Sequence, residues 1–492
     1  MVKSELVGDL TPVAETRRAS LIEKLSRALE ESGISYCHWK STEGLLRGFK
    51  EGDDLDLLVG ASDATRFNEL IHRFGFKKAR GPRAREFPGV AHYYGLDESS
   101  GALVHLHAYY RLVLGHDATK NYRLPIEDAY LASASHGHIF PIPAPGFELA
   151  VLVLRLVLKH NGWDSMLRLE GSISAAERRE LDLLTAVTDT DDLDEVVAQH
   201  LSFIGKDLFD DCFASVRPGA GVVARVAAAR RLTHALDGCA KTGPVVDLLR
   251  KSWGRGSWVL RRSLDKSFVK KRLETGGAVV AVVGGDGSGK SSTVGELRGW
   301  IRGPLRARTV HLGKPPRSVA RSFLKVWLSA DRRLRRRDAD GPADGPALGR
   351  AAGLRQVLVA RDRSRQHTKV RRAATRGEVV ICDRYPIPNI KLMDGPRLAR
   401  FETSPRRSER LLAQLERRYY NRILPPDVLL VLRVDPHKAA TRKIEEDFDF
   451  VRVRANEVWE IDWTQSAATV IDASQPLEDV VREAKEVLWS RL

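Results

Sequence analysis

Short apolar runs alternate with amphipathic segments along the last part of the chain. The runs are rich in valine, leucine and isoleucine, have the length of buried strands, and lie at 279–283, 309–312, 379–382, 428–434 and 469–471. The segments between them show helical periodicity. This alternation of strand and helix predicts a doubly wound parallel sheet that is covered by helices.

The beginning of the chain shows a more mixed pattern. An amphipathic stretch predicts a helix over 20–32, and three short runs predict strands over 34–39, 55–59 and 102–108. From residue 146 the pattern becomes helical and stays so to about residue 254. We therefore expect a mixed α/β fold at the start of the chain, followed by a helical middle.

The longest apolar run, 149–158, lies at the start of the helical stretch. Arg155 interrupts it, and it is too short to span a bilayer, so it predicts a buried helix. A cluster of tryptophan, glycine and basic residues at 251–258 reads as a boundary. The chain is thus expected to contain a mixed α/β domain over 1–145, a helical region over 146–270 and a second α/β domain over 271–492.

The stretch AVVAVVGGDGSGKSST at 278–293 predicts a phosphate-binding loop between a buried strand and a helix. Its glycines permit backbone conformations closed to other residues and let successive N–H groups surround an anion. The stretch fits G-x-x-x-x-G-K-[ST], in which the lysine reaches the β- and γ-phosphates and the serine binds Mg²⁺. The predicted ATP-binding residues are Gly284, Gly285, Asp286, Gly287, Ser288, Gly289, Lys290, Ser291 and Ser292.

Charged residues follow two other predicted strands of the same sheet. Asp383 comes directly after the strand 379–382, where an acid that organises Mg²⁺ is expected, and Arg384 beside it could hold an acceptor phosphate. A helix after the strand 428–434 carries Arg442 and Lys443, whose charges could close over a transferring phosphoryl group. The alternative is a surface turn with an internal ion pair at Asp383 and solvated charges on the helix.

The order of these motifs resembles the thymidylate kinase family over about 215 residues. The matching segments are VVGGDGSGKSS, ARDRSRQH, GEVVICDRYP, PPDVLLVLRVDPHKAATRK, FVRVRANEVWE and VIDASQPLEDVVREAKEVL. The resemblance implies a P-loop kinase in which Lys290 and Ser291 serve ATP and Mg²⁺, and Asp383 organises the metal. It also implies that Asp286, Arg363 and Arg384 contact the acceptor and that Arg442 belongs to a lid.

The chain departs from this family directly after its DRY sequence. The family usually carries a Ser/Ala-Tyr-Gln segment that contacts the nucleotide acceptor, whereas this chain reads PIPNIKLMDGPRL at 386–398. A pocket that discriminates by hydrogen bonds needs its polar partners in place. Two acceptor hypotheses follow: a nucleoside monophosphate such as dTMP, or another small metabolite such as a sugar derivative. A non-catalytic nucleotide-binding switch is the third hypothesis.

A second chemistry is indicated near the start of the chain. Asp54 and Asp56 occupy alternate positions on a predicted strand, so they share a face and could hold divalent ions for nucleotidyl transfer, and Ser41 could touch a triphosphate. This resembles the nucleotidyltransferase superfamily related to DNA polymerase beta, over about 20–135. Lys40 stands where that family usually has glycine, and His105 or His107 where it has a third carboxylate. An acidic turn before an edge strand is the alternative, and a binding-only domain remains open.

The amino-acid composition favours some classes of binding partner over others. The formal net charge of +16 favours polyanionic binding partners, and the segment 321–376 holds 16 basic and five acidic residues. Few aromatic residues are interleaved there, so nucleic acid is disfavoured, while contact with a membrane surface and homo-oligomer formation stay open. The four widely spaced cysteines and the absence of a visible signal peptide lead us to expect a cytoplasmic protein that acts on a small-molecule acceptor.

Overall fold

The chain forms two compact α/β units in a computed structural model. The model describes residues 20–40, 54–82, 86–117, 119–135, 139–160, 173–251, 270–313, 315–316, 350–388, 390, 395–443 and 446–492. The first unit comprises Met1–Phe76, Tyr94–Leu114 and Tyr122–Ala240, and the second comprises Lys77–Tyr93, Gly115–Asn121 and Lys241–Leu492. The α/β class expected from the sequence is confirmed, with one mixed and one parallel sheet.

The mixed sheet has six strands in the order β1-β2-β5-β4-β3-β8. Its strands are β1 (Tyr36–His38), β2 (Asp54–Val59), β3 (Lys77–Arg80), β4 (Val90–Asp97), β5 (Ala102–Tyr109) and β8 (Arg272–Leu273). β1 is antiparallel to β2, whereas β2 is parallel to β5. A separate hairpin joins β6 (Leu112–Leu114) and β7 (Tyr122–Leu124). The three strands expected from the sequence are therefore present as β1, β2 and β5.

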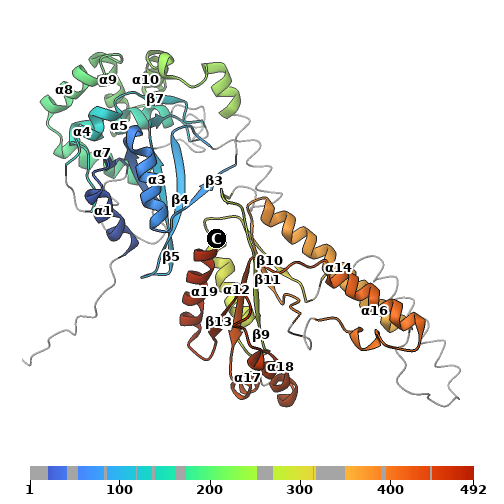
Figure 1. Ribbon diagram of the computed structural model, residues 1–492. Helices are drawn as coiled ribbons and strands as arrows, with labels where there is room; N and C mark the ends of the chain where they lie inside the picture. The colour runs from blue at the N-terminus through green and yellow to red at the C-terminus, as the bar shows by residue number, and fades with distance from the viewer. Residues whose placement is uncertain are drawn as a thin grey trace, which may run out of the picture. The chain divides into compact units, whose positions relative to one another are not determined.

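The first unit contains one almost wholly apolar helix, α5. Its helices are α1 (Leu21–Glu31), η1 (Ala61–Asp63), α3 (Ala64–Arg73), α4 (Glu127–Ala132), α5 (Pro145–Lys159), α7 (Ala175–Val187), α8 (Thr190–His200), α9 (Lys206–Val216), α10 (Val222–Ala235) and η3 (Asp237–Cys239). Nearly every residue of α5 is buried, and α7, α8, α9 and α10 pack against it (Figure 1). The expected buried helix is thus confirmed, and it is the core of this helical layer.

The second unit is built on a five-stranded parallel sheet of order β10-β11-β9-β12-β13. Its strands are β9 (Val279–Gly284), β10 (Ala307–His311), β11 (Val379–Asp383), β12 (Val428–Arg433) and β13 (Ala468–Asp472). All five were expected from their apolar runs. The chain passes from β9 to β10 and β11 on one side and then to β12 and β13 on the other. In such sheets ligands bind beyond the carboxyl ends of the strands where the winding direction reverses.

Helices cover both faces of the parallel sheet. The helices of the second unit are α12 (Lys290–Arg302), α14 (Arg350–Thr375), η5 (Ala399–Phe401), α16 (Arg407–Tyr420), α17 (Pro436–Arg442), α18 (Phe448–Glu460) and α19 (Leu477–Arg491), of which α16 packs on α14 and η5. α12 and α19 pack together on one face, and α14 packs on β9 and β11 from the other face (Figure 1). The doubly wound arrangement leaves α17 and α18 together near the end of the sheet.

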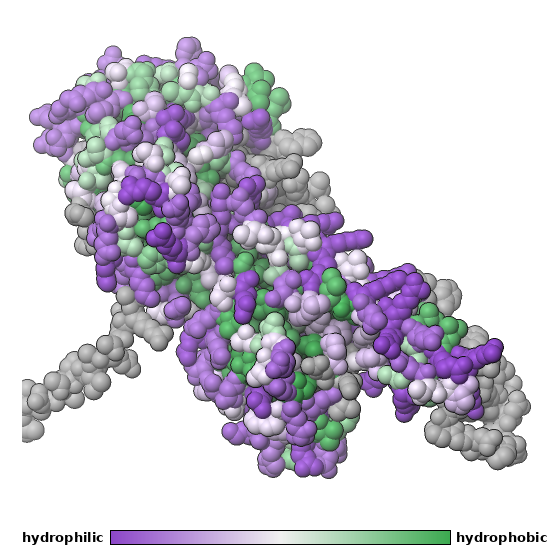
Figure 2. Space-filling view, viewed as in Figure 1, coloured by the Kyte–Doolittle hydropathy of each residue, from purple (hydrophilic) through white to green (hydrophobic). Residues whose placement is uncertain are grey.

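The face of the described chain seen in Figure 2 is mostly polar. Hydrophilic residues cover most of the visible face in Figure 2, and apolar residues appear there as small scattered patches. Among the described helices, none combines the length and the apolar character needed to cross a bilayer.

Gly277, just before β9, lies very close to the backbone of a neighbouring segment. A Cβ atom added there would lie 2.0 Å from the carbonyl oxygen of Glu378, a buried residue at the start of β11. We expect Gly277→Ala to lower the free energy of unfolding by about 1–3 kcal/mol, because the two backbones must separate. Gly295→Ala on α12 is the matched control, since nothing lies within 4 Å of its added Cβ.

Both variants are compared with the wild type by denaturant unfolding. Gly295→Ala should be neutral or stabilising by up to about 1 kcal/mol, because alanine favours the helix. An unchanged midpoint for Gly277→Ala would contradict the close packing of β9 on β11.

Candidate functional site

The glycine-rich loop between β9 and α12 is held from two sides. Gly287 has a φ of +81°, and a Cβ added there would lie 2.3 Å from the carbonyl oxygen of Ala439 on α17. A Cβ on Gly285 would lie 2.6 Å from the Cα of Ala455 on α18. Only glycine therefore lets this loop adopt its conformation and lie against both helices.

The N-terminus of α12 points into the same loop. Its N-cap, Gly289, is in the left-handed conformation and provides no side-chain cap, and no acidic residue lies in the first turn. The first N–H groups of a helix are unsatisfied by the helix itself and carry its positive dipole end. The loop and helix together can therefore hold an anion.

Asp286 lies at the centre of a cluster of cations from three elements. Its side chain is 3% exposed, with Arg384 Nη2 at 3.0 Å, Arg454 Nη1 at 2.8 Å and Lys290 Nζ at 3.9 Å from its carboxylate oxygens. Burial acts to raise the pKa of Asp286, but the hydrogen bond from Arg454 and the charges of Lys290 and Arg384 outweigh it and hold this pKa below its ordinary value. Asp286 is therefore ionised and links the loop, the end of β11 and α18.

Lys290 is the most deeply buried of these cations. It donates a hydrogen bond from Nζ to the carbonyl oxygen of Gly285 at 2.5 Å. Burial lowers the pKa of its ammonium group to about 8, although the carboxylate of Asp286 opposes this shift. The lysine thus sits beside the loop with its charge only partly compensated.

Asp383 ends β11 next to β9. In the parallel ladder it is level with Val282, and its Oδ2 lies 3.9 Å from Nε2 of His311. Asp383 Oδ1 and the Oγ of Ser288 are buried without a hydrogen-bond partner in the described part of the chain. Buried oxygen atoms of this kind suit a hydrated Mg²⁺ ion or a ligand.

Two predicted serines lie in the first turn of α12, and the backbone of the predicted Arg384 is strained. Ser291 and Ser292 are exposed in the first turn of α12. Arg384 has a φ of +57°, in the left-handed region that residues other than glycine rarely adopt. Strain of this type is retained where the surroundings demand one side-chain position, here the contact with Asp286.

Two predicted arginines lie elsewhere in the second unit. Arg363 on α14 donates to the carbonyl oxygens of Leu312 and Gly313, each at 2.9 Å, so it fixes the chain that follows β10. Arg442 donates from Nη1 to the carbonyl oxygen of Ala473 at 2.8 Å, which ties α17 to the chain after β13. Both guanidinium groups thus bind backbone carbonyls, and Arg363 also donates to the hydroxyl of Tyr420.

Arg454 is the functional candidate that sequence reasoning missed. Two arginines alternate in the stretch FVRVR, and the helical phase of α18 separates them. Arg452 pairs with the exposed Asp449, whereas Arg454 lies over the ring of Phe450 and reaches Asp286. The buried positions Val451, Ala455 and Val458 are the signal that could have shown which arginine faces the loop.

The predicted nucleotidyltransferase residues meet on two strands of the first unit. β2 and β5 are parallel, with Asp54 level with His105 and Asp56 level with His107. Nδ1 of His105 lies 2.5 Å from Asp54 Oδ1, and Nδ1 of His107 lies 3.0 Å from Asp56 Oδ1. The strand register therefore places two carboxylates and two imidazoles together.

Each carboxylate of this group has an imidazole or ammonium neighbour. Burial acts to raise the pKa of Asp54, but the hydrogen bond and charge of His105 and the charge of His107 lower it below its ordinary value. Lys40 Nζ lies 3.3 Å from Asp56 Oδ1 and 2.5 Å from the hydroxyl of Tyr109. Ser41 lies outside the described residues, as do most of the basic stretch 321–376 and part of the segment 386–398.

Comparison with models of known protein families gives no match. A search of curated proteins gives none either. A function for this chain is therefore inferred from its own residues.

Proposed function

We propose that the second unit is an ATP- and Mg²⁺-dependent phosphotransferase of thymidylate kinase type, with a nucleoside monophosphate such as dTMP or a related small metabolite as acceptor. The observation that carries this proposal is the cation cluster around Asp286, at a glycine loop beside Asp383. A phosphoryl group needs fixed positive charge where its own negative charge develops, in a site shielded from water. Buried Lys290 and half-buried Arg384 and Arg454 meet that need.

Each residue then has a definite task. The loop N–H groups and Lys290 would bind the β- and γ-phosphates, and Ser291 with Asp383 would hold Mg²⁺, which neutralises phosphate charge when bound. Arg384 and Arg454 would shift part of their interaction from Asp286 to the transferred group. An acceptor oxygen forms a bond to the γ-phosphorus while the bond to the ADP oxygen breaks.

The identity of the acceptor depends on Asp286 and Arg384. Arg363 is held by carbonyl oxygens, so it supports the acceptor side of the site indirectly, through the chain after β10. Asp286 and Arg384 alone could bind a sugar derivative as well as a nucleotide. A switch that binds ATP without an acceptor stays as the third candidate, and acceptor-dependent turnover separates it from the other two.

Phosphate transfer from labelled ATP tests the proposal directly. With Mg²⁺ present, dTMP, other nucleoside monophosphates and sugar phosphates are offered to the wild type, to Lys290→Ala and to Lys369→Ala, which removes an exposed lysine of α14. We expect turnover with one acceptor class and a loss of about 100-fold or more in Lys290→Ala, because a transition-state cation is gone. Lys369→Ala should match the wild type. ATP binding without turnover on any acceptor would favour the switch.

The affinity for ATP should depend on pH through Lys290. Its pKa is about 8 in the free protein, and bound phosphates would raise it, so the complex holds a proton that the free site loses above pH 8. Affinity should be level from pH 7 to 8 and then fall towards tenfold per pH unit. Calorimetric titration between pH 7 and 9.5 measures this. In Lys290→Met the affinity should no longer begin to fall at pH 8. If it still falls there as steeply as in the wild type, another group causes the pH dependence.

Nucleotidyl transfer in the first unit is the second candidate function. The observation that favours it is the side-by-side placement of Asp54 and Asp56 with His105 and His107. Two carboxylates and two imidazoles form a mixed oxygen and nitrogen donor set, which suits Mn²⁺ or another transition metal better than a pair of Mg²⁺ ions. These residues would orient a nucleoside triphosphate for attack at its α-phosphorus.

Transfer of labelled nucleoside monophosphate from a nucleoside triphosphate tests this second function. Asp54→Ala should abolish the transfer, since it removes a ligand, while Lys290→Ala should leave it within about twofold. Mn²⁺ should support more transfer than Mg²⁺. Loss of the activity in Lys290→Ala with retention in Asp54→Ala would assign the chemistry to the glycine loop instead.

A further inference from the structure

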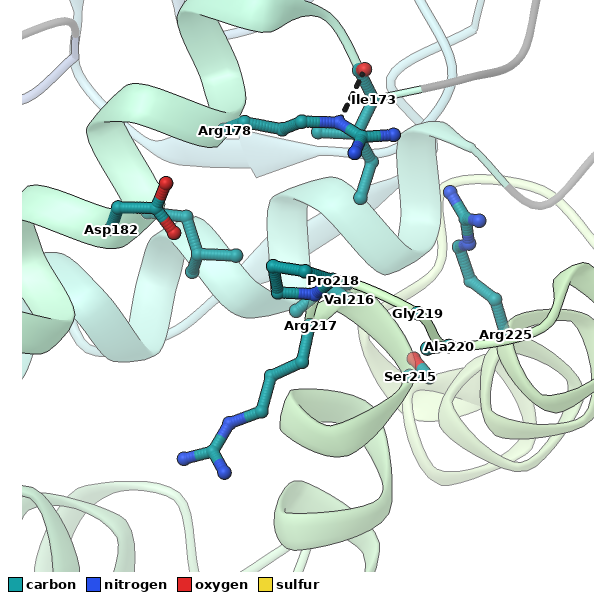
Figure 3. A pocket seen from close by; sticks show the side chains of 11 residues that line it. Ile173, Arg178, Asp182, Ser215, Val216, Arg217, Pro218, Gly219, Ala220 and Arg225 are labelled. Carbon is teal, nitrogen blue, oxygen red and sulfur yellow. Dashed lines mark hydrogen bonds between the residues drawn. The ribbon is translucent and has the colours of Figure 1, made fainter.

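A pocket in the helical layer of the first unit gathers positive charge. Its walls come from α7, from the C-terminal end of α9 and from the chain that leads into α10 (Figure 3). Arg178, Ser215, Gly219 and Arg225 are among the lining residues, and the cavity volume is about 50 Å³. A pocket of this size admits a small polar group and little more.

Arg225 is buried in this pocket with donors that nothing satisfies. Its residue exposure is 7%, and its Nε and Nη1 are buried without a hydrogen-bond partner in the described part of the chain. A buried guanidinium without an acceptor is costly, so native proteins normally provide one. Something outside the described chain is therefore expected to supply oxygen atoms to Arg225.

A second arginine faces the same space. Figure 3 shows the side chain of Arg178 extending from α7 towards the side on which Arg225 stands on α10, and Asp182, which also lines the pocket, lies on the other side of Arg178. Arg178 donates from Nε to the carbonyl oxygen of Ile173 at 3.3 Å, and neither arginine forms an ion pair with a described carboxylate. Burial, followed by the charge of Arg178, lowers the pKa of Arg225. Arg178 is exposed to solvent, whereas Arg225 is buried, so Arg225 is the cation that lacks both water and a described ion-pair partner.

The start of α10 adds a third positive element. Its N-cap, Gly221, makes no side-chain cap, and no acidic residue lies in the first turn. Gly219 and Ala220 of the preceding chain line the pocket, so the start of this helix, with its positive dipole end, lies close to it. The helix terminus and the buried arginine are independent features that call for the same partner.

We propose that this pocket binds a phosphoryl group, either as inorganic phosphate or as part of a small phosphorylated metabolite. A phosphate dianion offers several acceptor oxygens and two negative charges, enough to serve two guanidinium forks and a helix N-terminus at once. A carboxylate offers one negative charge and two coplanar oxygens, which suffice for one guanidinium group only. The pocket lies within the first unit and its role does not depend on the proposed kinase activity.

Hydrogen–deuterium exchange with inorganic phosphate tests the proposal. The full chain carries Lys290→Ala, so that phosphate at the glycine loop does not dominate, and ionic strength is held constant with chloride. We expect saturable protection of amides over 215–225. Arg225→Met should raise the phosphate concentration needed for half-protection about tenfold or more, since a charge-assisted hydrogen bond is lost.

Arg230→Met is the matched control, because Arg230 is an exposed arginine on the same helix. It should leave the half-protection concentration within twofold of the parent. Arg178→Met should weaken protection as Arg225→Met does. A sugar phosphate that protects at lower concentration than inorganic phosphate would identify a metabolite as the occupant, and the reverse order would identify the free ion.

Folding of the variants is checked by thermal unfolding without phosphate. Arg225→Met should melt at the same temperature as the parent or higher, because it replaces an uncompensated buried charge with an apolar side chain. No protection of 215–225 at any phosphate concentration would overturn the proposal. Equal protection in the parent, Arg225→Met and Arg230→Met would overturn it as well.

Discussion

The second unit depends on one buried carboxylate. Asp286 receives Arg384 from the end of β11 and Arg454 from α18, and it lies within 4 Å of Lys290 at the start of α12. Without this charge three cations would repel one another in a water-poor space. The loop also packs so closely against α17 and α18 that there is no room for a side chain at its glycines. Charge and close packing therefore select the same arrangement.

This arrangement explains why the ends of the strands matter more than their interiors. The interiors of β9, β11 and β12 are apolar and almost fully buried, so they set the sheet and its register. The register brings Asp383 level with Val282, directly before the glycine loop. A carboxylate and a loop that are about 100 residues apart in sequence thus become neighbours because two buried strands pair. The candidate functional residues therefore lie where the apolar runs of the strands end.

The sequence predicted the elements that have a clear apolar or alternating pattern and missed those that do not. All five strands of the parallel sheet were expected within about two residues of their observed bounds, because buried runs are unambiguous. β3 reads KKAR and β4 reads VAHYYGLD, which carry too many polar residues for a clear period. The doubly wound class follows from alternation, but the pairing of β2 with β5 does not, since it is a tertiary contact.

The same limit applies to side chains. The glycine loop, Lys290 and Asp383 could be predicted because a motif carries them. The bonds of Arg363 and Arg442 could not, because backbone carbonyls that accept them lie dozens of residues away in the sequence. Arg225 was invisible for another reason: in the stretch VVARVAAARRLTHAL an arginine reads as a solvated charge. Only burial shows that it is not.

Charge balance separates the three polar clusters of this chain. Around Asp54 and Asp56 each carboxylate has an imidazole or ammonium neighbour, and around Asp286 one carboxylate serves three cations. In the pocket that Asp182 also lines, buried Arg225 forms no ion pair with a described carboxylate. The second and third clusters therefore contain buried cations that described carboxylates compensate only in part or not at all. Since a buried charge is costly unless it is paired, an anionic ligand at either cluster would stabilise the folded chain.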